Sequence, residues 1–478
     1  MKIAFVASEA AGYIKTGGLG DVIQSLPASL AKYKNNEVCV FIPYYKAIKE
    51  NKRIKTELIK SFDVDLSWRR QYVGVYKSKA RRKVAVYLID NEYYFGRDNC
   101  YGYFDDGERF AYFSKAVLQA MLELDIKPDI IHSNDWQSAL VPIFLHAFYH
   151  ESLGSAKTVY TIHNMEYQGK TDPYFICDTL GLPAEYTKTL TYDGCINFMK
   201  GAILSADAVT TVSKTYAEEI KYPYFAYGLS DIINQHAFKL SGIVNGIDTK
   251  LYNPETDKTL FANYNVCTFK EGKRKNKEAL QEELGLEING DIPVIAMVTR
   301  LVSHKGLDLV CAALDELMSK ELQIVIIGTG DYSYEQKLKA CAENNPKKLS
   351  VNLCFNSALA SQIYASADMF LMPSKSEPCG LSQLIAMRYG TVPIVKTTGG
   401  LKDTVSPFET ETQTGLGFTF QTFNKDDMVD AINRAINVYL NDKDSWNKLV
   451  ENDITKDSSW DKQTQEYITL YKKLSTIM

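Results

Sequence analysis

Short apolar runs rich in β-branched residues alternate with helical patterns along most of this 478-residue chain. The runs lie at 2–7, 37–42, 84–89, 129–132, 158–162 and 208–212, and then at 293–299, 322–328, 368–372 and 391–395. Strands that alternate with helices form parallel sheets built from βαβ units, so this rhythm predicts an α/β fold. Such sheets bind ligands at the carboxyl ends of their strands, where we expect the functional side chains.

The two series of strands are separated by a polar stretch at about 253–291. At about 150 residues per domain the length alone suggests three domains, but two series of strands favour two doubly wound, Rossmann-like domains. We predict one domain over 1–245, a second over 246–458, and a closing segment over 459–478 that packs back on the first domain. Two such domains facing each other would form a cleft.

Helical periodicity predicts how several segments pack. The charged run at 271–278, inside the polar stretch, is interpreted as a solvated helix start or loop. Apolar residues at helical spacing predict a helix over 306–318 and a closing helix from about Trp460. Their expected buried stripes are Leu307, Val310, Leu314 and Leu317 in the first, and Tyr467, Leu470, Tyr471 and Leu474 in the second.

The composition is that of an ordinary globular protein, with 45% hydrophobic and 23% charged residues. The 54 Lys and Arg residues nearly balance the 58 Asp and Glu residues, and the net charge of -4 argues against a large basic surface for nucleic acid. No apolar run approaches the ~20 residues of a membrane-spanning helix, and the run after Lys2 is too short for a signal peptide. We therefore expect a cytoplasmic protein that binds neither nucleic acid nor membrane.

Neither the cysteines nor the acidic residues indicate a metal site. The nine cysteines are scattered, odd in number and without CxxC spacing, which favours neither a disulfide framework nor zinc. Asp63 and Asp65 form a DxD pattern like the metal-binding DxD of some transferases, but they lie in an alternating, strand-like run without supporting motifs. We predict no metal and no cofactor.

A Gly-rich turn at 15–22 follows the first strand and leads into a helix with apolar positions Val22, Leu26 and Leu30. Glycines let the backbone approach a ligand, free N–H groups at a helix start favour anions, and Lys15 adds a positive charge. A tight turn without function is the alternative. The spacing is neither GxGxxG nor that of a P-loop, which weakens a nicotinamide dehydrogenase. A similar sequence at 396–405 indicates a second such turn in a duplicated fold, unless the match is chance.

Two motifs of the second half follow strands and precede helices. Arg300 and Lys305 lie on one loop, where a planar fork of donors and a compact point charge suit a diphosphate, with surface ion pairs as the alternative. Glu377 could bind sugar hydroxyls, together with the N–H groups of Gly380 and Leu381, unless it only caps the helix at 381–389. Cys379 is interpreted as a packed thiol because no Cys-His-Asn spacing supports a nucleophile.

Polar side chains also follow two strands of the first half. His163 comes just after the strand that ends at Ile162, and His132 and Asp135 lie at the equivalent end of the preceding strand. A lone His is usually structural, but strand ends that deliver His, Asp and His together favour a site. The segment 245–248 indicates a turn. Most of the aromatic residues are expected in the core, but Tyr94 and Phe95, in an aromatic cluster, are candidates for a sugar-stacking loop.

These motifs together resemble those of the bacterial glycogen synthases and plant starch synthases, which are retaining glucosyltransferases of glycosyltransferase family 5 with two-domain GT-B architecture. The resemblance covers nearly the whole chain. Its motifs are KTGGLGDV at 15–22, HSNDW at 132–136, TIHNMEYQG at 161–169, NFMKGAI at 197–203, VNGID at 244–248, TRLVSHKGLDL at 299–309, EPCGLSQLIAMRYGT at 377–391 and TTGGLKDTV at 397–405.

The resemblance implies a role for each matching residue. It implies catalytic roles for Glu377, Asp135, His163, Arg300 and Lys305, with Glu377 on the transferred glucose, His163 on its 6-hydroxyl and both cations on the phosphates. The implied donor site comprises Lys15, Gly17, Gly18, Asp21, Asn245, Arg300, Lys305, Cys379, Gly380 and Leu381. Asp135 would lie near the acceptor or the reacting sugar. The aromatic cluster, and not the resemblance, makes Tyr94 and Phe95 the candidates for an acceptor-lining loop.

Some positions depart from the family pattern. His304 precedes Lys305 where Gln is common, Tyr252 replaces a frequent Trp, and Ser133 and Asn134 differ from a common HxHDW motif. Leu384 occupies the place of the second carboxylate of the E-x7-E motif, which is also usual in this branch. These departures weaken detailed donor assignments more than they weaken the class.

The implied reaction transfers glucose from ADP-glucose to the non-reducing end of an α-1,4-glucan with retention of configuration. UDP-glucose is the alternative donor. A non-catalytic nucleotide-sugar-binding protein and a GT-B epimerase are alternatives of other classes, and a glucan phosphorylase would need a pyridoxal lysine and a longer chain. No carboxylate is clearly placed as a covalent nucleophile, so departure and attack on the same face of the sugar is the preferred mechanism.

Overall fold

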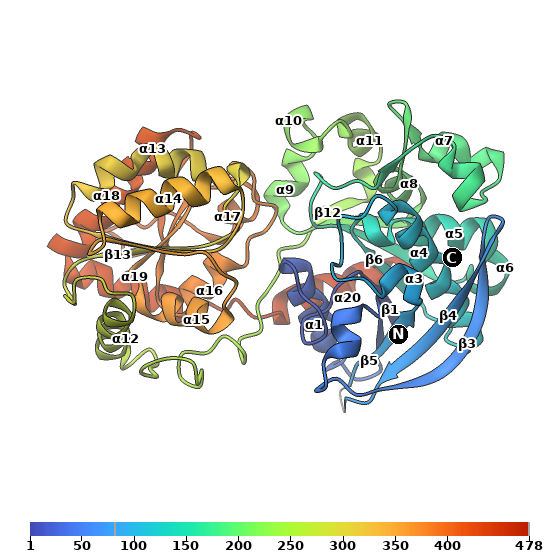
Figure 1. Cartoon of the computed structure of the whole chain (residues 1–478), viewed down its shortest axis with the longest axis horizontal. Coiled ribbons are helices and arrows are strands. Elements are labelled where there is room, and N and C mark those ends of the chain that lie inside the picture. The colour runs from blue at the N-terminus through green and yellow to red at the C-terminus, as the bar shows by residue number, and fades with distance from the viewer. Residues whose placement is uncertain (81–82, 477–478) are drawn as a thin grey trace. The chain divides into compact units, whose positions relative to one another are not determined.

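The computed structural model describes residues 1–80 and 83–476. The chain divides into two compact units (Figure 1). Unit 1 comprises Met1–Asn245 and the segment from Trp460 onward, and unit 2 comprises Gly246–Ser459. Each unit has its own parallel sheet and its own hydrophobic core.

The large sheet of unit 1 is parallel from β12 to β5 and ends in an antiparallel hairpin. Its strands, in sheet order, are β12 (Leu240–Gly242), β11 (Ala208–Thr211), β7 (Lys157–Ile162), β6 (Ile130–Asn134), β1 (Lys2–Val6), β2 (Glu37–Pro43), β5 (Ala85–Asp90), β4 (Arg69–Ser78) and β3 (Thr56–Leu66). The hairpin β3–β4 lies outside the predicted parallel series, because its exposed strands alternate polar and apolar residues. Asp63 does lie in a strand, β3, as predicted.

Helices and a small sheet complete unit 1. The helices are α1 (Gly18–Leu30), α2 (Lys46–Glu50), α3 (Glu92–Phe95), α4 (Asp106–Glu123), α5 (Leu140–Phe148), α6 (His150–Leu153), α7 (Thr187–Leu190), α8 (Phe198–Ser205), α9 (Lys214–Glu219), α10 (Pro223–Ala226), α11 (Ser230–Gln235) and α20 (Asp461–Thr476). The small antiparallel sheet is formed by β8 (Lys170–Thr171), β10 (Cys195–Asn197) and β9 (Thr191–Tyr192).

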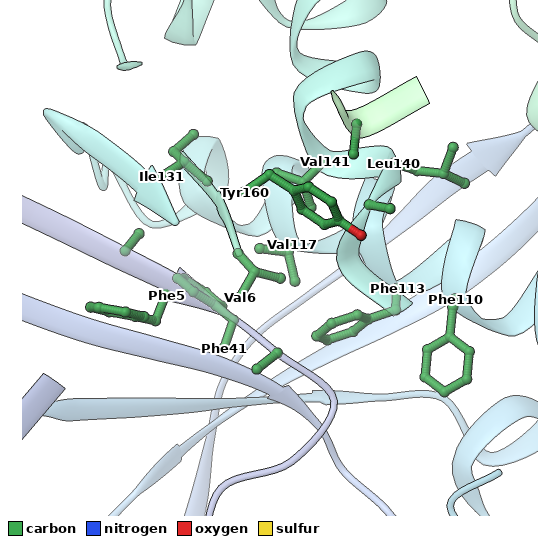
Figure 2. Close-up of a cluster of buried hydrophobic side chains, with 14 of the residues drawn as sticks. Phe5, Val6, Phe41, Phe110, Phe113, Val117, Ile131, Leu140, Val141 and Tyr160 are labelled. Atoms are coloured by element: carbon green, nitrogen blue, oxygen red, sulfur yellow. The ribbon is translucent and has the colours of Figure 1, made fainter. Parts of the chain in front are cut away.

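The core of unit 1 forms where the central strands meet α4 and α5 (Figure 2). Phe5 of β1, Phe41 of β2 and Val117 of α4 are completely buried there. Central strands of a parallel sheet are covered on both faces, which explains why β1 is a nearly continuous apolar run instead of an alternating one. The predicted helix after the first Gly-rich turn is confirmed as α1, with Val22, Leu26 and Leu30 buried.

The closing helix α20 packs on unit 1, beside α1 (Figure 1). The hydroxyl of Tyr471 lies 2.7 Å from Nδ1 of His132, and Nε2 of the same ring lies 2.5 Å from Oγ1 of Thr161. Burial lowers the pKa of His132 to about 3, so the ring is neutral. The expectation that His132 faces a ligand is therefore wrong: one ring nitrogen bonds α20 and the other bonds the neighbouring strand β7.

Unit 2 is built on one parallel sheet. Its strands, in sheet order, are β15 (Leu349–Asn352), β14 (Gln323–Ile327), β13 (Val294–Val298), β16 (Met369–Met372), β17 (Val392–Lys396) and β18 (Phe418–Phe420). Its helices are α12 (Phe269–Glu283), α13 (Leu307–Met318), α14 (Tyr332–Asn344), α15 (Ser357–Ser366), α16 (Ser382–Arg388), α17 (Gly399–Thr404), α18 (Lys425–Asn441) and α19 (Lys443–Thr455). The predicted stripe of α13 is confirmed as buried.

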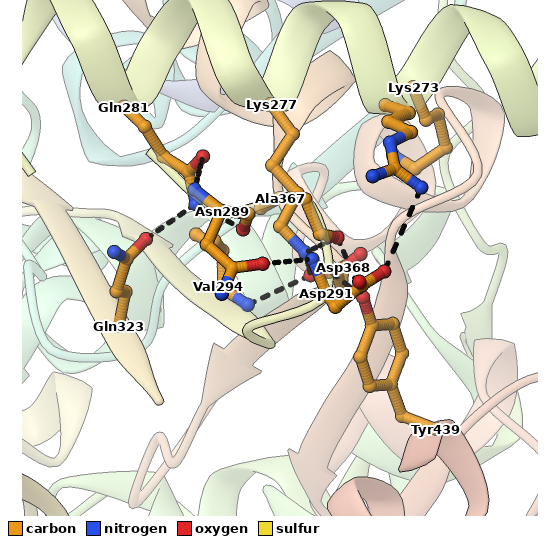
Figure 3. A network of polar contacts seen from close by, with 12 residues as sticks. Lys273, Lys277, Gln281, Asn289, Asp291, Val294, Gln323, Ala367, Asp368 and Tyr439 are labelled. Carbon is orange, nitrogen blue, oxygen red and sulfur yellow. Dashed lines mark hydrogen bonds and ion pairs between the residues drawn. The ribbon is translucent and has the colours of Figure 1, made fainter. Parts of the chain in front are cut away.

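The charged run at 271–278 lies on α12 and is not merely solvated, which corrects the expectation. Lys277 is 3% exposed, and its Nζ lies 2.7 Å from Oδ2 of Asp368, 3.0 Å from the Gly290 carbonyl and 3.0 Å from the Tyr439 hydroxyl (Figure 3). Lys273 lies one turn away, on the same face. The sequence shows these charges, but the partner that permits their burial is about 90 residues further along the chain.

Among the described residues, no helix is both long enough and apolar enough to cross a membrane.

Replacing Tyr471 by Phe tests the junction between α20 and the sheet. The change leaves a buried His132 nitrogen without its partner, so unit 1 should lose about 1–3 kcal/mol of unfolding free energy. Urea unfolding followed by tryptophan fluorescence measures this loss. Tyr174→Phe, at a position that is 81% exposed on the same unit, is the matched control. Equal midpoints for the two variants would contradict the assigned role of the hydrogen bond.

Candidate active site

Three neighbouring strands of unit 1 end at the same edge of the sheet. β6 pairs in parallel with β1 on one side and with β7 on the other. Glu9 follows β1, Asp135 follows β6 and His163 follows β7. Parallel pairing therefore brings together three polar side chains that are far apart in the sequence, and we refer to them with the loop 15–18 as the N-terminal half-site.

The Lys15 loop connects β1 to α1. Nζ of Lys15 lies 2.7 Å from Oδ2 of Asp21, in the first turn of α1, so the lysine is held in an ion pair. Burial raises the pKa of Asp21 even though Lys15 lowers it. Thr16, Gly17 and Gly18 are exposed, and no atom lies within 4 Å of the position that a Cβ of Gly17 would occupy. The start of α1 is therefore open to a ligand.

Glu9 holds the Lys15 loop by hydrogen bonds, a role that the sequence did not predict. Its carboxylate accepts hydrogen bonds from the Thr16 N–H at 2.5 Å, the Thr16 hydroxyl at 2.7 Å and the Gly17 N–H at 3.3 Å. In the sequence Glu9 marks only the end of the first apolar run. A charged residue directly after a buried strand and before a Gly-rich turn is the signal that could have identified it.

The carboxylate of Asp135 is bonded to the backbone of His163. Oδ1 of Asp135 accepts the His163 N–H at 2.7 Å, and Asp135 has a positive φ of 58°. A positive φ is uncommon for a residue with a side chain and is found in strained segments of functional sites. Burial raises the pKa of Asp135 from 3.8 to about 7. Perturbed pKa values of this kind are common among groups at functional sites.

The ring of His163 is neutral and oriented. Burial lowers its pKa to about 3, and Nε2 lies 3.0 Å from Oδ1 of Asn134. The amide nitrogen of Asn134 donates to the carbonyls of Val6 and His132, so its oxygen must face the imidazole. Nε2 of His163 therefore carries the proton and Nδ1 remains an acceptor. A neutral imidazole of fixed tautomer suits a hydrogen bond to a sugar hydroxyl.

The C-terminal half-site, in unit 2, combines two motifs that the sequence treated separately. Nζ of Lys305 lies 2.6 Å from Oε2 of Glu377, and the Ser374 hydroxyl donates to the same oxygen at 3.0 Å. Glu377 is 6% exposed. The two loops meet because β13 and β16, which they follow, are neighbours in the sheet. Arg300 is exposed, and no other side chain in the described ranges forms an ion pair with it.

The second Gly-rich turn supports the Glu377 loop. It connects β17 to α17, the same strand–helix position that the first turn occupies, as predicted. A Cβ on Gly399 would lie 2.0 Å from the Glu377 carbonyl, and a Cβ on Gly400 would lie 2.1 Å from the Cys379 carbonyl. Only glycine permits this approach. The Gly400 N–H donates to the Glu377 carbonyl at 3.0 Å, which fixes the loop.

The remaining donor-side candidates differ in exposure. Cys379 is buried, in agreement with the packed-thiol interpretation, and Gly380 has φ +73° just before Leu381 and the start of α16. Asn245 is 4% exposed, and its Oδ1 has no hydrogen-bond partner among the residues of the structure, which leaves an acceptor for a ligand. Asp248 accepts the N–H groups of Lys250 and Leu251, so the turn begins at Asp248 and otherwise lies after the predicted segment 245–248.

Tyr94 and Phe95 do not line a surface, which corrects the expectation for the acceptor loop. Both side chains are completely buried, and the Tyr94 hydroxyl donates to Oε1 of Glu108 at 2.5 Å. They form the inner face of the short helix α3, packed against Tyr112 of α4. Tyr93 of the same cluster is 65% exposed. An aromatic-rich sequence does not indicate which rings point outward.

Among the described residues, no cluster of three or more His, Cys, Asp and Glu side chains could hold a metal ion. The cations available to a negatively charged ligand are Lys15 in unit 1 and Arg300 and Lys305 in unit 2. Lysine and arginine can neutralise a diphosphate directly.

Family models match both units of the chain. A model described as the starch synthase catalytic domain matches residues 2–235, and one described as glycosyl transferases group 1 matches residues 280–453. Curated relatives match almost the entire chain. Glycogen synthase of Bacillus cereus (strain Q1) is 47% identical over 99% of this chain and 100% of its own length, and glycogen synthase of Finegoldia magna is 48% identical with the same coverage.

Solved structures agree with this similarity. The catalytic domain of starch synthase IV from Arabidopsis thaliana, bound to ADP and acarbose, matches with a TM-score of 0.92 and 33% identity over 99% of each chain. This match confirms the predicted GT-B architecture of two Rossmann-like domains. A sucrose-phosphate synthase from Thermosynechococcus elongatus matches with a TM-score of 0.61 and 16% identity over 99% of this chain and 98% of its own, which supports the fold alone.

Replacing Asp135 by Asn tests the raised pKa of the carboxyl group. Burial favours the protonated form, so wild-type stability contributed by this group should fall as pH rises from about 4 to about 7 and stay constant above. Asn cannot ionise but still accepts the His163 N–H. The Tm of Asp135→Asn minus the Tm of wild type should therefore be a few °C larger at pH 8 than at pH 5. Thermal unfolding at both pH values measures the gain.

The matched control is Asp231→Asn, since Asp231 is exposed on the same unit. Its Tm difference from wild type should not change with pH in this window. A difference between Asp135→Asn and wild type that is equally constant would contradict a pKa near 7.

Proposed function

Because the chain belongs to the family of bacterial glycogen synthases and starch synthases, we propose that it elongates an α-1,4-glucan with glucose from ADP-glucose. As a member of this family it is a glucosyltransferase. The observation that carries the donor proposal is the Lys305–Glu377 pair. In a nucleotide-sugar donor, the bond that breaks joins a phosphate to a sugar. The Lys305 cation can bind that phosphate, and the neighbouring Glu377 carboxylate can bind hydroxyls of that sugar.

The proposed donor site uses both half-sites. In unit 2, Arg300 and Lys305 hold the diphosphate, Glu377 holds the glucose hydroxyls, and the backbone of Cys379, Gly380 and Leu381 supplies further donors. Lys15, Gly17, Gly18 and Asp21 bring the start of α1 to the same ligand, and Asn245 offers its free acceptor. Asp135 and His163 are proposed to lie at the reacting sugar, with the glucan acceptor beside Asp135.

An adenine nucleotide is the proposed base of the donor. The related starch synthase IV structure holds ADP and acarbose, which supports ADP-glucose here. UDP-glucose is the alternative, since none of the groups described above contacts a base. A cytoplasmic location is also proposed, supported by the free thiols of the described cysteines.

The proposed mechanism stabilises two developing charges. Negative charge grows on the departing phosphate, where Arg300, Lys305 and the start of α1 act as fixed donors and charges. Lys305 exchanges Glu377 for the phosphate as the donor binds, which frees Glu377 for the sugar hydroxyls. Positive charge grows on the anomeric carbon. The acceptor hydroxyl attacks from the face that the phosphate leaves, and the phosphate takes its proton. A trapped glucosyl adduct on Asp135 or Glu377 would contradict this mechanism.

A non-catalytic nucleotide-sugar-binding protein on the same fold is the main alternative. Such a protein can lose reactive groups while it keeps phosphate-binding ones. Here Glu377 and His163 are both present and held by hydrogen bonds alongside Lys305. This arrangement favours a working transferase.

Incorporation of ¹⁴C-labelled glucose into glycogen tests the donor. The purified protein is incubated with labelled ADP-glucose or UDP-glucose, and the washed polymer is counted. We expect incorporation from ADP-glucose at a rate well above that from UDP-glucose. A preference for UDP-glucose would overturn the donor proposal, and transfer from neither would overturn the reaction.

Replacing Glu377 by Ala tests the sugar-binding carboxylate. Glucosyl transfer should fall by about 100-fold or more, the usual effect of removing one fixed polar group from a transition state. Glu316→Ala, on the surface of the same unit, is the matched control and should retain full activity. Initial rates and thermal unfolding are measured for both. A folded Glu377→Ala enzyme with wild-type rates would contradict the proposed role.

A further inference from the structure

Glu9 is a buried carboxylate that no motif of the chain includes. It is 3% exposed and follows β1 in the segment Ser8–Ala10. Oε2 accepts the Thr16 N–H at 2.5 Å and the Gly17 N–H at 3.3 Å, and Oε1 accepts the Thr16 hydroxyl at 2.7 Å. The Tyr101 hydroxyl also donates to Oε1, at 2.7 Å. Four donors therefore converge on one side chain.

These bonds hold a loop that is otherwise exposed. Thr16, Gly17 and Gly18 are all exposed, and the space beside Gly17 is empty. Thr16 and Gly17 lie just before α1. The hydrogen bonds of their N–H groups therefore fix the backbone conformation with which the loop enters the helix. A single carboxylate satisfies this set of donors because its two oxygens offer about four acceptor positions.

We propose that Glu9 is a positioning residue of the transferase: it fixes the Lys15 loop so that Lys15 and the start of α1 meet the donor diphosphate. This inference rests on the proposed function, since it assumes that the loop binds the donor. Glu9 does not touch the donor itself. It acts through Thr16 and Gly17, and Tyr101 holds Glu9 in turn, with Ser8 bonded to the Tyr101 hydroxyl at 2.7 Å.

The charge of Glu9 also reaches the other part of the N-terminal half-site. It contributes to the raised pKa of Asp135, after the larger effect of burial. The other titratable groups near Glu9 are Tyr45, Tyr101 and Cys100, whose pKa values burial raises, so they stay neutral. Tyr160 and Tyr216 face Asp135 and are likewise neutral. Glu9, which follows β1, is therefore the acidic neighbour whose charge raises the pKa of Asp135.

Two substitutions separate hydrogen-bond positioning from carboxylate chemistry. Glu9→Ala removes every bond to the loop. Glu9→Gln keeps the size and shape: its amide oxygen can accept the Thr16 and Gly17 N–H groups, and its NH₂ group can donate to the Thr16 and Tyr101 hydroxyls. Glu151→Gln, at an exposed position on α6 of the same unit, is the matched control. Steady-state rates with ADP-glucose and glycogen and thermal unfolding are measured for each variant.

We expect Glu9→Ala to lose about 100-fold in kcat/KM for ADP-glucose, as for a misplaced binding group, with the KM for glycogen unchanged. Glu9→Gln should return kcat/KM at pH 7 to within about fivefold of wild type, as expected when the bonds are restored. Its pH-dependent loss of stability should also move to lower pH than in wild type, because Asp135 loses a neighbouring negative charge. Glu151→Gln should stay close to wild type.

Two results would overturn the inference. A folded Glu9→Ala variant with wild-type kcat/KM would show that the loop does not need the hydrogen bonds of Glu9. A Glu9→Gln variant as inactive as Glu9→Ala would show that the carboxylate itself reacts. If Glu9→Ala does not fold, Thr16→Val is used in its place. Thr16 is exposed, and this change removes only the hydrogen bond from the Thr16 hydroxyl to Glu9. A several-fold rise in the KM for ADP-glucose supports the inference, and an unchanged KM overturns it. Failure of wild type to transfer glucose would instead contradict the proposed function.

Discussion

The parallel pairing of neighbouring strands is the constraint on which both half-sites depend. In unit 1 the pairs Val6–Ser133 and Asn134–Thr161 align the ends of β1, β6 and β7. Glu9, Asp135 and His163 emerge at that edge. In unit 2 the neighbours β13 and β16 bring Lys305 to Glu377. Residues separated by up to about 150 positions thus become neighbours without any local sequence signal.

Most charged groups of the two half-sites already have a partner within the chain, and Arg300 is the exception among the described residues. Lys15 is paired with Asp21, Lys305 with Glu377, and Glu9 with the donors of its loop. Such pairing limits the cost of removing charge from water and keeps the groups oriented before a ligand arrives. The arrangement also explains the small net charge of -4, because an uncharged glucan needs no basic surface and the few required cations are local.

The features predicted correctly from the sequence have local signals. Periodicity identified α1, α13 and α20, and the Gly-rich turns were placed between a strand and a helix. The features that were missed depend on distant partners. Glu9 needs Tyr101 and the loop, and Lys277 needs Asp368. Tyr94 and Phe95 were misjudged because the inward face of α3 is set by packing on α4 and not by composition.

The central claim is that this chain adds glucose, through an α-1,4 bond, to the non-reducing ends of a glucan. The most direct test is digestion with β-amylase of glycogen that the enzyme has labelled, because β-amylase removes maltose only from such ends and only through α-1,4 bonds. The account predicts that the label is released early and as maltose. Label that resists β-amylase while the outer chains are removed would contradict the account.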